Sequence, residues 1–261
     1  MVFSNQKGGV GKTTCCRELG IFLAERDYDT LLIDADPQGN LSRSLTDIPG
    51  NGLYDALSGF EYEEARLITP VFENLSLLGG GVKLAGLEKA LIGELDAFTR
   101  LRDLLEEERF TDYAFILIDS PPSLGVLTGN ALTASNHLII PMNPSLYSMQ
   151  GTNDLMVTVS KVRKNFNPGL NLLGVIINAY EGSQRSGLRS GPVISRQIHD
   201  EIRESFGDKV FQASLSKSIR VEEAIALKAG VIDRPKVNGK VNRVAGELES
   251  IGLELLNRLG L

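Results

Sequence analysis

Residues 7–14 read KGGVGKTT, a glycine-rich loop with a lysine near each end. Glycines let backbone N–H groups turn inward around a phosphate, while the lysine and the hydroxyl that close such a loop serve the β- and γ-phosphates and Mg²⁺. We therefore expect Lys12 to bind nucleotide phosphates and Thr13 to face the metal ion. The residues of this loop that we expect to bind nucleotide are Lys7, Gly8, Gly9, Val10, Gly11, Lys12, Thr13 and Thr14.

The other lysine, Lys7, stands before the glycines. From that position it is poorly placed to fold back onto the nucleotide of its own chain, so its natural target is a phosphate presented by a second copy. The loop therefore predicts a dimer with nucleotides sandwiched between two subunits. In such a dimer Lys7 and Lys12 would both be catalytic residues.

The chain on either side of the loop has the order that a phosphate-binding loop requires. Met1–Phe3 is apolar and suits a strand, and Thr13–Glu25 has the helical spacing of apolar residues at Leu19, Phe22 and Leu23. A strand, a glycine loop and a helix in this order are the context that supports the motif.

Two apolar strand candidates end in carboxylates. Asp34 and Asp36 follow the first, and Asp119 follows the second. Mg²⁺ is usually held by one or two carboxylates together with phosphate oxygens and waters. We therefore expect Asp119 to hold a metal-bound water opposite Thr13, and Asp36 to position the water that attacks the γ-phosphate.

Apolar runs typical of strands alternate with helical stretches along the chain. This alternation predicts an α/β fold with a doubly wound, mostly parallel sheet, helices on both faces, and a single domain over residues 1–261. The expected strands are Thr30–Ile33, Leu75–Leu78, Tyr113–Ile118, His137–Ile140, Leu172–Ile177 and Lys209–Ala213. The expected helices are Leu84–Glu108, Leu124–Ala134, Leu146–Phe166, Pro192–Phe206 and Val241–Leu259.

The net charge of −6 is unevenly distributed. Residues 161–243 hold 15 Lys and Arg against 8 Asp and Glu, a balance of +7, and the remainder has a balance of −13. A basic surface suits phosphate backbones, although an ordinary solvated face explains the same charge. The residues that we expect to bind DNA, if this surface does, are Arg189, Lys217, Arg220, Lys236, Lys240 and Arg243.

Two further features concern location and redox state. No apolar run is long enough to span a bilayer, and the phosphate loop follows the N-terminus without a signal peptide, so we expect a cytoplasmic protein. Cys15 and Cys16 are adjacent on the helix after the loop. Because they cannot link distant segments there, we expect them to pack as small hydrophobes.

Four blocks of sequence resemble the ParA/Soj family of partition ATPases. They read NQKGGVGKTT, LLIDADPQGN, IDSPPSLGVLTGNAL and LIIPMNPSLYSMQG, in the family's order and spacing. The DPQGN continuation distinguishes the chain from MinD, nitrogenase-iron-protein and Mrp relatives, which share the lysine-headed loop. The resemblance implies an ATPase that uses ATP and Mg²⁺ and forms a homodimer on ATP binding. It also implies a nucleoid-associated protein that binds double-stranded DNA without sequence preference. A ParB-type centromere-binding protein is implied to stimulate its ATP hydrolysis and so release it from DNA.

The resemblance also implies roles for single residues. Lys7 matches the signature lysine that crosses the dimer, and Gly8 matches the glycine that faces the partner's loop. Asp36 matches the hydrolytic aspartate, and Asp34 is implied to support the metal site. Asn178, which ends the apolar run VIINAY, falls where relatives contact the adenine base.

A second segment of the resemblance concerns DNA. Residues 214–224 resemble the family's PRNVRLSEA segment, which contributes to DNA binding, and Lys217 and Arg220 take its two basic positions. Ser216 stands where relatives often have a proline, which indicates a less rigid loop.

Three alternative functions use the same loop. A membrane-positioning ATPase like MinD would need a basic amphipathic tail, whereas residues 247–259 are amphipathic but acidic, which favours docking onto the protein body. A metallocluster carrier would need cluster cysteines, and Cys15 and Cys16 are wrongly placed for that. A relative that positions a protein assembly by the same DNA-based mechanism stays open.

Overall fold

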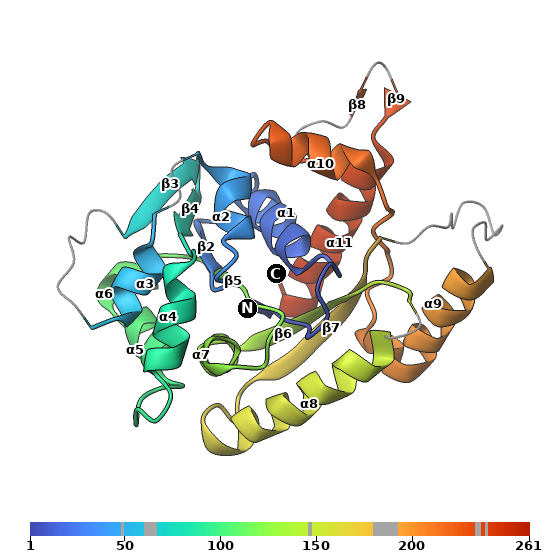
Figure 1. Cartoon of the computed structure of the whole chain (residues 1–261). Coiled ribbons are helices and arrows are strands. Elements are labelled where there is room, and N and C mark those ends of the chain that lie inside the picture. Colours follow the sequence, from blue (N-terminus) through green and yellow to red (C-terminus); the bar gives the residue numbers. More distant parts are fainter. Residues whose placement is uncertain (48–49, 60–66, 146–147, 180–192, 233–235, 238–239) are drawn as a thin grey trace.

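The computed structural model describes residues 1–47, 50–59, 67–145, 148–179, 193–232, 236–237 and 240–261 (Figure 1). Its centre is a seven-stranded sheet in the order β3-β4-β2-β5-β1-β6-β7, in which only the edge strand β3 runs antiparallel to its neighbour. The expected doubly wound, mostly parallel sheet is therefore confirmed. The strands are β1 (Val2–Phe3), β2 (Thr30–Asp34), β3 (Ile68–Phe72), β4 (Leu75–Leu78), β5 (Phe115–Asp119), β6 (His137–Met142) and β7 (Asn171–Ile177).

Helices cover both faces of the sheet, and a short hairpin of β8 (Lys236–Val237) and β9 (Lys240–Val241) lies apart from it (Figure 1). The helices are α1 (Lys12–Ala24), α2 (Asn40–Leu45), α3 (Gly52–Leu57), α4 (Lys83–Ala90), α5 (Arg100–Leu105), α6 (Glu108–Thr111), α7 (Val126–Thr133), α8 (Ser148–Asn165), α9 (Val193–Phe206), α10 (Ile219–Ala226) and α11 (Arg243–Leu259).

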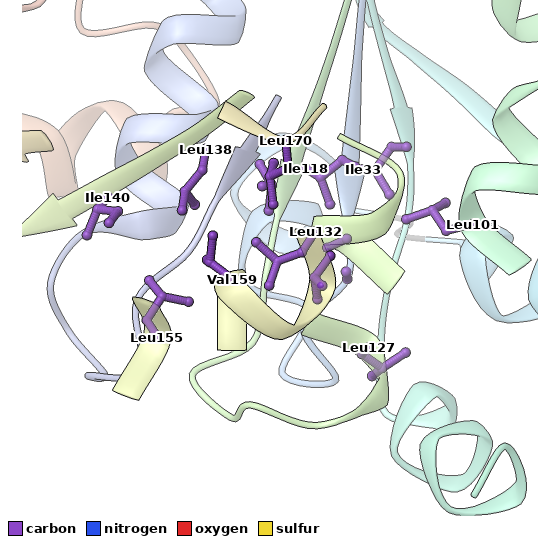
Figure 2. Packing of buried hydrophobic residues seen from close by; sticks show 14 of the residues in the cluster. Ile33, Leu101, Ile118, Leu127, Leu132, Leu138, Ile140, Leu155, Val159 and Leu170 are labelled. Carbon is purple, nitrogen blue, oxygen red and sulfur yellow. The ribbon is translucent and has the colours of Figure 1, made fainter. Parts of the chain in front are cut away.

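Successive strand residues enter two different apolar clusters, because side chains alternate between the faces of a sheet. In β6, Leu138 and Ile140 join a cluster that contains residues of α5, α7 and α8, several of which Figure 2 shows. Ile139, between them, joins a second cluster built with α1 and α11. Strands that are buried on both faces explain the nearly continuous apolar runs in the sequence.

The acidic C-terminal helix docks onto the protein body, as expected. Leu248, Ile251 and Leu255 of α11 are buried in the second cluster. A side chain added at Gly252 would lie 2.5 Å from the ring of Phe22, so α11 approaches α1 very closely. Cys15 and Cys16 are also buried in this cluster, where burial raises the pKa of both thiols, so their expected packing role is confirmed.

Two expected elements were wrong. The single helix over Leu84–Glu108 is two short helices, α4 and α5, and α6 begins only at its last residue. Gly93, with a left-handed φ of 96°, interrupts the chain between α4 and α5, and the extended backbone of Glu107 separates α5 from α6. The strand over Lys209–Ala213 is absent, and among the described residues there only Val210 bridges to β7. The Arg258 guanidinium of α11 instead binds the carbonyl oxygens of residues 173, 208, 209 and 210.

Several other element bounds differ from the expectations. The strand expected over Tyr113–Ile118 begins two residues later, at Phe115, and ends at Asp119. The elements that the sequence did not predict are α2, α3, β3, α10 and the β8–β9 hairpin. All five are short, so their periodicity was too brief to recognise.

Candidate nucleotide site and basic surface

The glycine loop connects β1 to α1 at the carboxyl edge of the sheet. Gly11 caps α1 with a left-handed φ of 91°, and Gly9 has a φ of 71°. A side chain at Gly11 would also lie 1.9 Å from Nδ2 of Asn178, so this position requires glycine for two reasons. Gly8 and Gly9 have open space where a side chain would begin.

Asn178 follows β7 and supports the loop. Its side-chain Nδ2 donates to the carbonyl oxygen of Val10 at 2.9 Å, and its backbone N–H donates to the carbonyl oxygen of Met142 at 2.6 Å. Residue 178 thus joins the end of β7 to the phosphate loop. The adenine contact implied by the family resemblance stays a prediction.

Lys12 begins α1 and is 6% exposed. Its Nζ donates to the carbonyl oxygen of Lys7 at 3.2 Å, and burial lowers its pKa against the opposing effects of Asp119 and Asp36. No ion pair within 4.0 Å is formed by Lys12 in the part of the chain that the structure describes. A buried cation in a glycine loop suits an anionic ligand.

Thr13 and Asp119 meet across the site. The Thr13 hydroxyl donates to Oδ2 of Asp119 at 2.6 Å. The other oxygen, Oδ1, is buried and has no hydrogen-bond partner among the described residues. Burial, followed by the charge of Asp34, raises the pKa of Asp119 well above its usual value. A carboxylate with a spare oxygen beside a hydroxyl fits the oxygen ligands that Mg²⁺ prefers.

Asp34 pairs with Asp119 across β2 and β5 and is fully buried, which raises its pKa to about 6. Both of its oxygens accept hydrogen bonds: one from the Asp36 N–H at 3.2 Å, the other from the backbone and hydroxyl of Ser42 at 2.8 and 2.7 Å. Asp34 therefore positions the segment that carries Asp36. Asp36 is 7% exposed and accepts from the Gln38 N–H at 2.9 Å.

Lys7 contacts residues that the sequence did not single out. Its Nζ donates to the hydroxyl of Ser145, and its backbone N–H donates to the Asn5 side chain at 3.1 Å. Asn5 and Ser145 follow β1 and β6, so the rule that ligand sites gather at the carboxyl ends of parallel strands was the available signal. Ser42 had no comparable signal, because a lone serine in a short helix is common.

All but one of the residues expected to bind DNA lie in the part of the chain that the structure describes. Lys217, Arg220 and Arg243 are described, and Lys236 and Lys240 lie on the paired strands β8 and β9. Figure 1 shows α10 beside the start of α11, with this hairpin next to it. Arg189 lies outside the described residues. We call these neighbouring segments the basic surface; it comprises Lys217, Arg220 and Arg243 together with the backbone of the β8–β9 hairpin.

The described arginines of the basic surface are paired with acids. Arg220 contacts Glu223 at 2.7 Å within α10, and Arg243 contacts Glu247 at 2.7 Å within α11. Lys217 is exposed. Ser216, where a less rigid loop was expected, donates to Glu247 through both its backbone N–H and its hydroxyl at 2.7 Å. These hydrogen bonds hold the loop to α11 in place of a proline.

The chain is similar to several proteins of known name. Residues 1–172 match the family described as "AAA domain". The chain is 36% identical to the chromosome-partitioning ATPase Soj of Treponema pallidum, over 86% of this chain and 85% of that protein. It is 38% identical to the chromosome partitioning protein ParA of Caulobacter vibrioides, over 86% and 82%.

Solved structures show the same fold. A cobyrinic acid a,c-diamide synthase from Mycobacterium smegmatis, with bound ADP and magnesium, is 31% identical and has a TM-score of 0.74 over 87% of this chain and 89% of that one. A Borrelia burgdorferi putative plasmid partition protein bound to AMPPNP is 23% identical, with a TM-score of 0.78 over 99% and 98%. The latter likeness supports the fold alone.

The described helices include none that is long and apolar enough to cross a bilayer. The glycine loop, the acidic strand ends and the relatives agree on one chemistry, which is hydrolysis of ATP with Mg²⁺. The chain belongs to the ParA/Soj family of partition ATPases.

Proposed function

We propose that residues 1–261 form one domain that binds ATP and Mg²⁺ at the glycine loop and hydrolyses ATP with the residues gathered there. The support is that Lys12, Thr13, Asp36 and Asp119, from three separate segments, meet at one edge of the sheet. Lys12 binds the β- and γ-phosphates. Asp36 orients the attacking water, and Asp34 holds Asp36 in place through the Asp36 N–H.

The metal site uses Thr13 and Asp119. The Thr13 hydroxyl would hold the metal ion, and Asp119 would hold it through a water, with the buried oxygen that lacks a partner among the described residues. Mg²⁺, when bound, neutralises charge that builds up on the phosphate oxygens.

Lys7 completes the site of a second copy. Lys7 is partly exposed beside Gly8 and Gly9, which leave space for the approach of another chain. In one subunit alone it rests on Ser145, a neutral partner that can be exchanged for a charged phosphate. We therefore infer that ATP drives formation of a homodimer.

The basic surface of each subunit binds double-stranded DNA through phosphates, without reading sequence. Joining two such surfaces in the dimer raises DNA affinity by effective concentration, so ATP controls DNA binding. A ParB-type protein, as in partition systems, supplies a basic segment that stimulates hydrolysis and releases the DNA. The protein acts in the cytoplasm, on the nucleoid, a location that suits the chromosome partitioning for which two relatives are named.

The test is binding of Asp36→Ala to random-sequence duplex DNA with ATP and with ADP, over a range of salt concentrations. We expect salt-sensitive binding with ATP only, because the variant forms the dimer but cannot leave it by hydrolysis. Lys12→Ala is the control, and it should bind DNA with neither nucleotide. If Asp36→Ala dimerises with ATP and does not bind DNA, the DNA proposal is wrong and a membrane or protein cargo takes its place.

A further inference from the structure

A buried ion pair lies one helical turn beyond the glycine loop. Arg17 and Glu18 of α1 contact each other, and both side chains have 0% exposure. Burying two charges costs several kcal/mol per ion unless other hydrogen bonds compensate. The additional partners of this pair therefore indicate what it holds together.

Those partners belong to two segments that are distant in sequence. The Arg17 Nη2 group donates to the carbonyl oxygen of Ala229 at 2.9 Å and to that of Ser44 at 3.4 Å. Oε2 of Glu18 accepts from the backbone N–H of Val231 at 2.9 Å. One guanidinium group thus joins α1, the end of α2, and the segment that follows α10.

Both ends of this connection have a role in the proposed function. Ser44 lies two residues after Ser42, which Asp34 holds, and α2 begins four residues after Asp36. At the other end, residues 229–231 begin three residues after the last residue of α10, the helix that carries Arg220 of the basic surface. At the protein surface, an ion pair between Lys228 and Asp47 also joins the segment after α10 to the segment after α2.

We propose that Arg17 and Glu18 couple the nucleotide site to α10, an inference that rests on the proposed function and deepens it. A shift of the Asp36 segment moves α2 and hence Ser44. Water cannot reach the pair to replace a broken hydrogen bond, so Arg17 transmits the shift to Ala229. Arg17 and Glu18 are positioning residues and touch no nucleotide.

The test removes the bridge and leaves the segment attached. In the double variant Arg17→Met/Glu18→Gln both charges are lost together, so neither is left unpaired. The remaining amide oxygen at position 18 still accepts from the Val231 N–H. Hydrogen–deuterium exchange of residues 219–231 is measured without nucleotide and with Mg²⁺–ATP, because this readout requires no DNA.

In the natural sequence we expect Mg²⁺–ATP to change exchange in residues 219–231. In the double variant, exchange without nucleotide and ATP affinity should be unchanged, while the response of residues 219–231 to ATP is lost. The control is Arg26→Gln/Glu249→Gln, which removes an exposed ion pair between Arg26, two residues after α1, and Glu249 of α11, and should keep the response.

The proposal is overturned if the response is undiminished in the double variant or missing from the natural sequence. It is also overturned if residues 219–231 of the variant exchange freely without nucleotide, because the pair would then serve stability alone. An exchange response in a protein that never binds DNA would support the coupling and refute the proposed DNA function, so the two failures differ.

Discussion

The nucleotide site and the basic surface differ in the burial and the pairing of their charged side chains. In the nucleotide site Lys12 is buried without an ion pair, and Asp119 keeps a buried oxygen without a partner, among the described residues. On the basic surface, Arg220 and Arg243 reach solvent and are paired with nearby glutamates. The first region lacks partners that a bound ligand would supply, whereas the second already has partners that DNA must displace.

This difference predicts two kinds of binding. A ligand that supplies the missing partners of buried charges binds with a large favourable free energy, because those charges have already lost their water. A polyanion that replaces surface glutamates gains little at each phosphate and depends on salt. We therefore expect strong effects from substitutions in the nucleotide site and graded effects from the basic surface.

The largest effect is expected from Lys12→Ala. Loss of the buried ammonium removes the phosphate contact, which should weaken Mg²⁺–ATP binding by about 2–5 kcal/mol, or at least ~30-fold in Kd. Calorimetric titration measures this affinity. Lys7→Ala is the matched control, and it should retain ATP binding by a single subunit while losing ATP-driven dimerisation.

Asp36→Ala should affect chemistry and leave binding alone. Loss of the group that orients water is expected to lower the rate of ATP hydrolysis by roughly 10²–10⁴-fold, with ATP affinity nearly unchanged. Phosphate release at saturating ATP measures the rate. Hydrolysis at the natural rate in this variant would show that another residue positions the water.

The glycine loop itself offers a sharper comparison. Gly11→Ala should strain the backbone by about 1–3 kcal/mol and push against Asn178, so ATP binding should fall. Gly8→Val has space in the single chain and should keep ATP affinity while preventing the dimer. Titration with ATP and sedimentation with ATP separate the two effects; equal loss of ATP binding in both would contradict the assigned dimer face.

The smallest effects are expected on the basic surface. Arg220→Ala should reduce the slope of log DNA affinity against log salt concentration by about 0.9 for each phosphate that the arginine neutralises. Glu223→Gln should strengthen DNA binding slightly, because it frees Arg220 from its partner. Lys89→Ala, at an exposed position of α4, is the control with the same change in charge. Equal effects of Arg220→Ala and Lys89→Ala would show that only net charge matters.

The sequence by itself determined the fold class and the nucleotide loop. Phosphate binding depends on local backbone geometry, so KGGVGKTT predicts its own structure, and the apolar runs predict a sheet buried on both faces. The Lys209–Ala213 strand failed because arginine side chains bind carbonyl oxygens that a strand would offer to a neighbour: Arg258 binds those of residues 209 and 210, and Arg203 binds those of residues 211 and 212.

Only the tertiary structure decided how distant side chains are partnered. The contact of Lys7 with Ser145, the hold of Asp34 on Ser42, and the Arg17 bridge to Ala229 depend on segments that the fold brings together. Adjacent charges such as Arg17 and Glu18 resemble an ordinary solvated helix in sequence. Their burial follows from α2 and α11 packing against α1, with the segment after α10 bonded to the pair, which local periodicity does not encode.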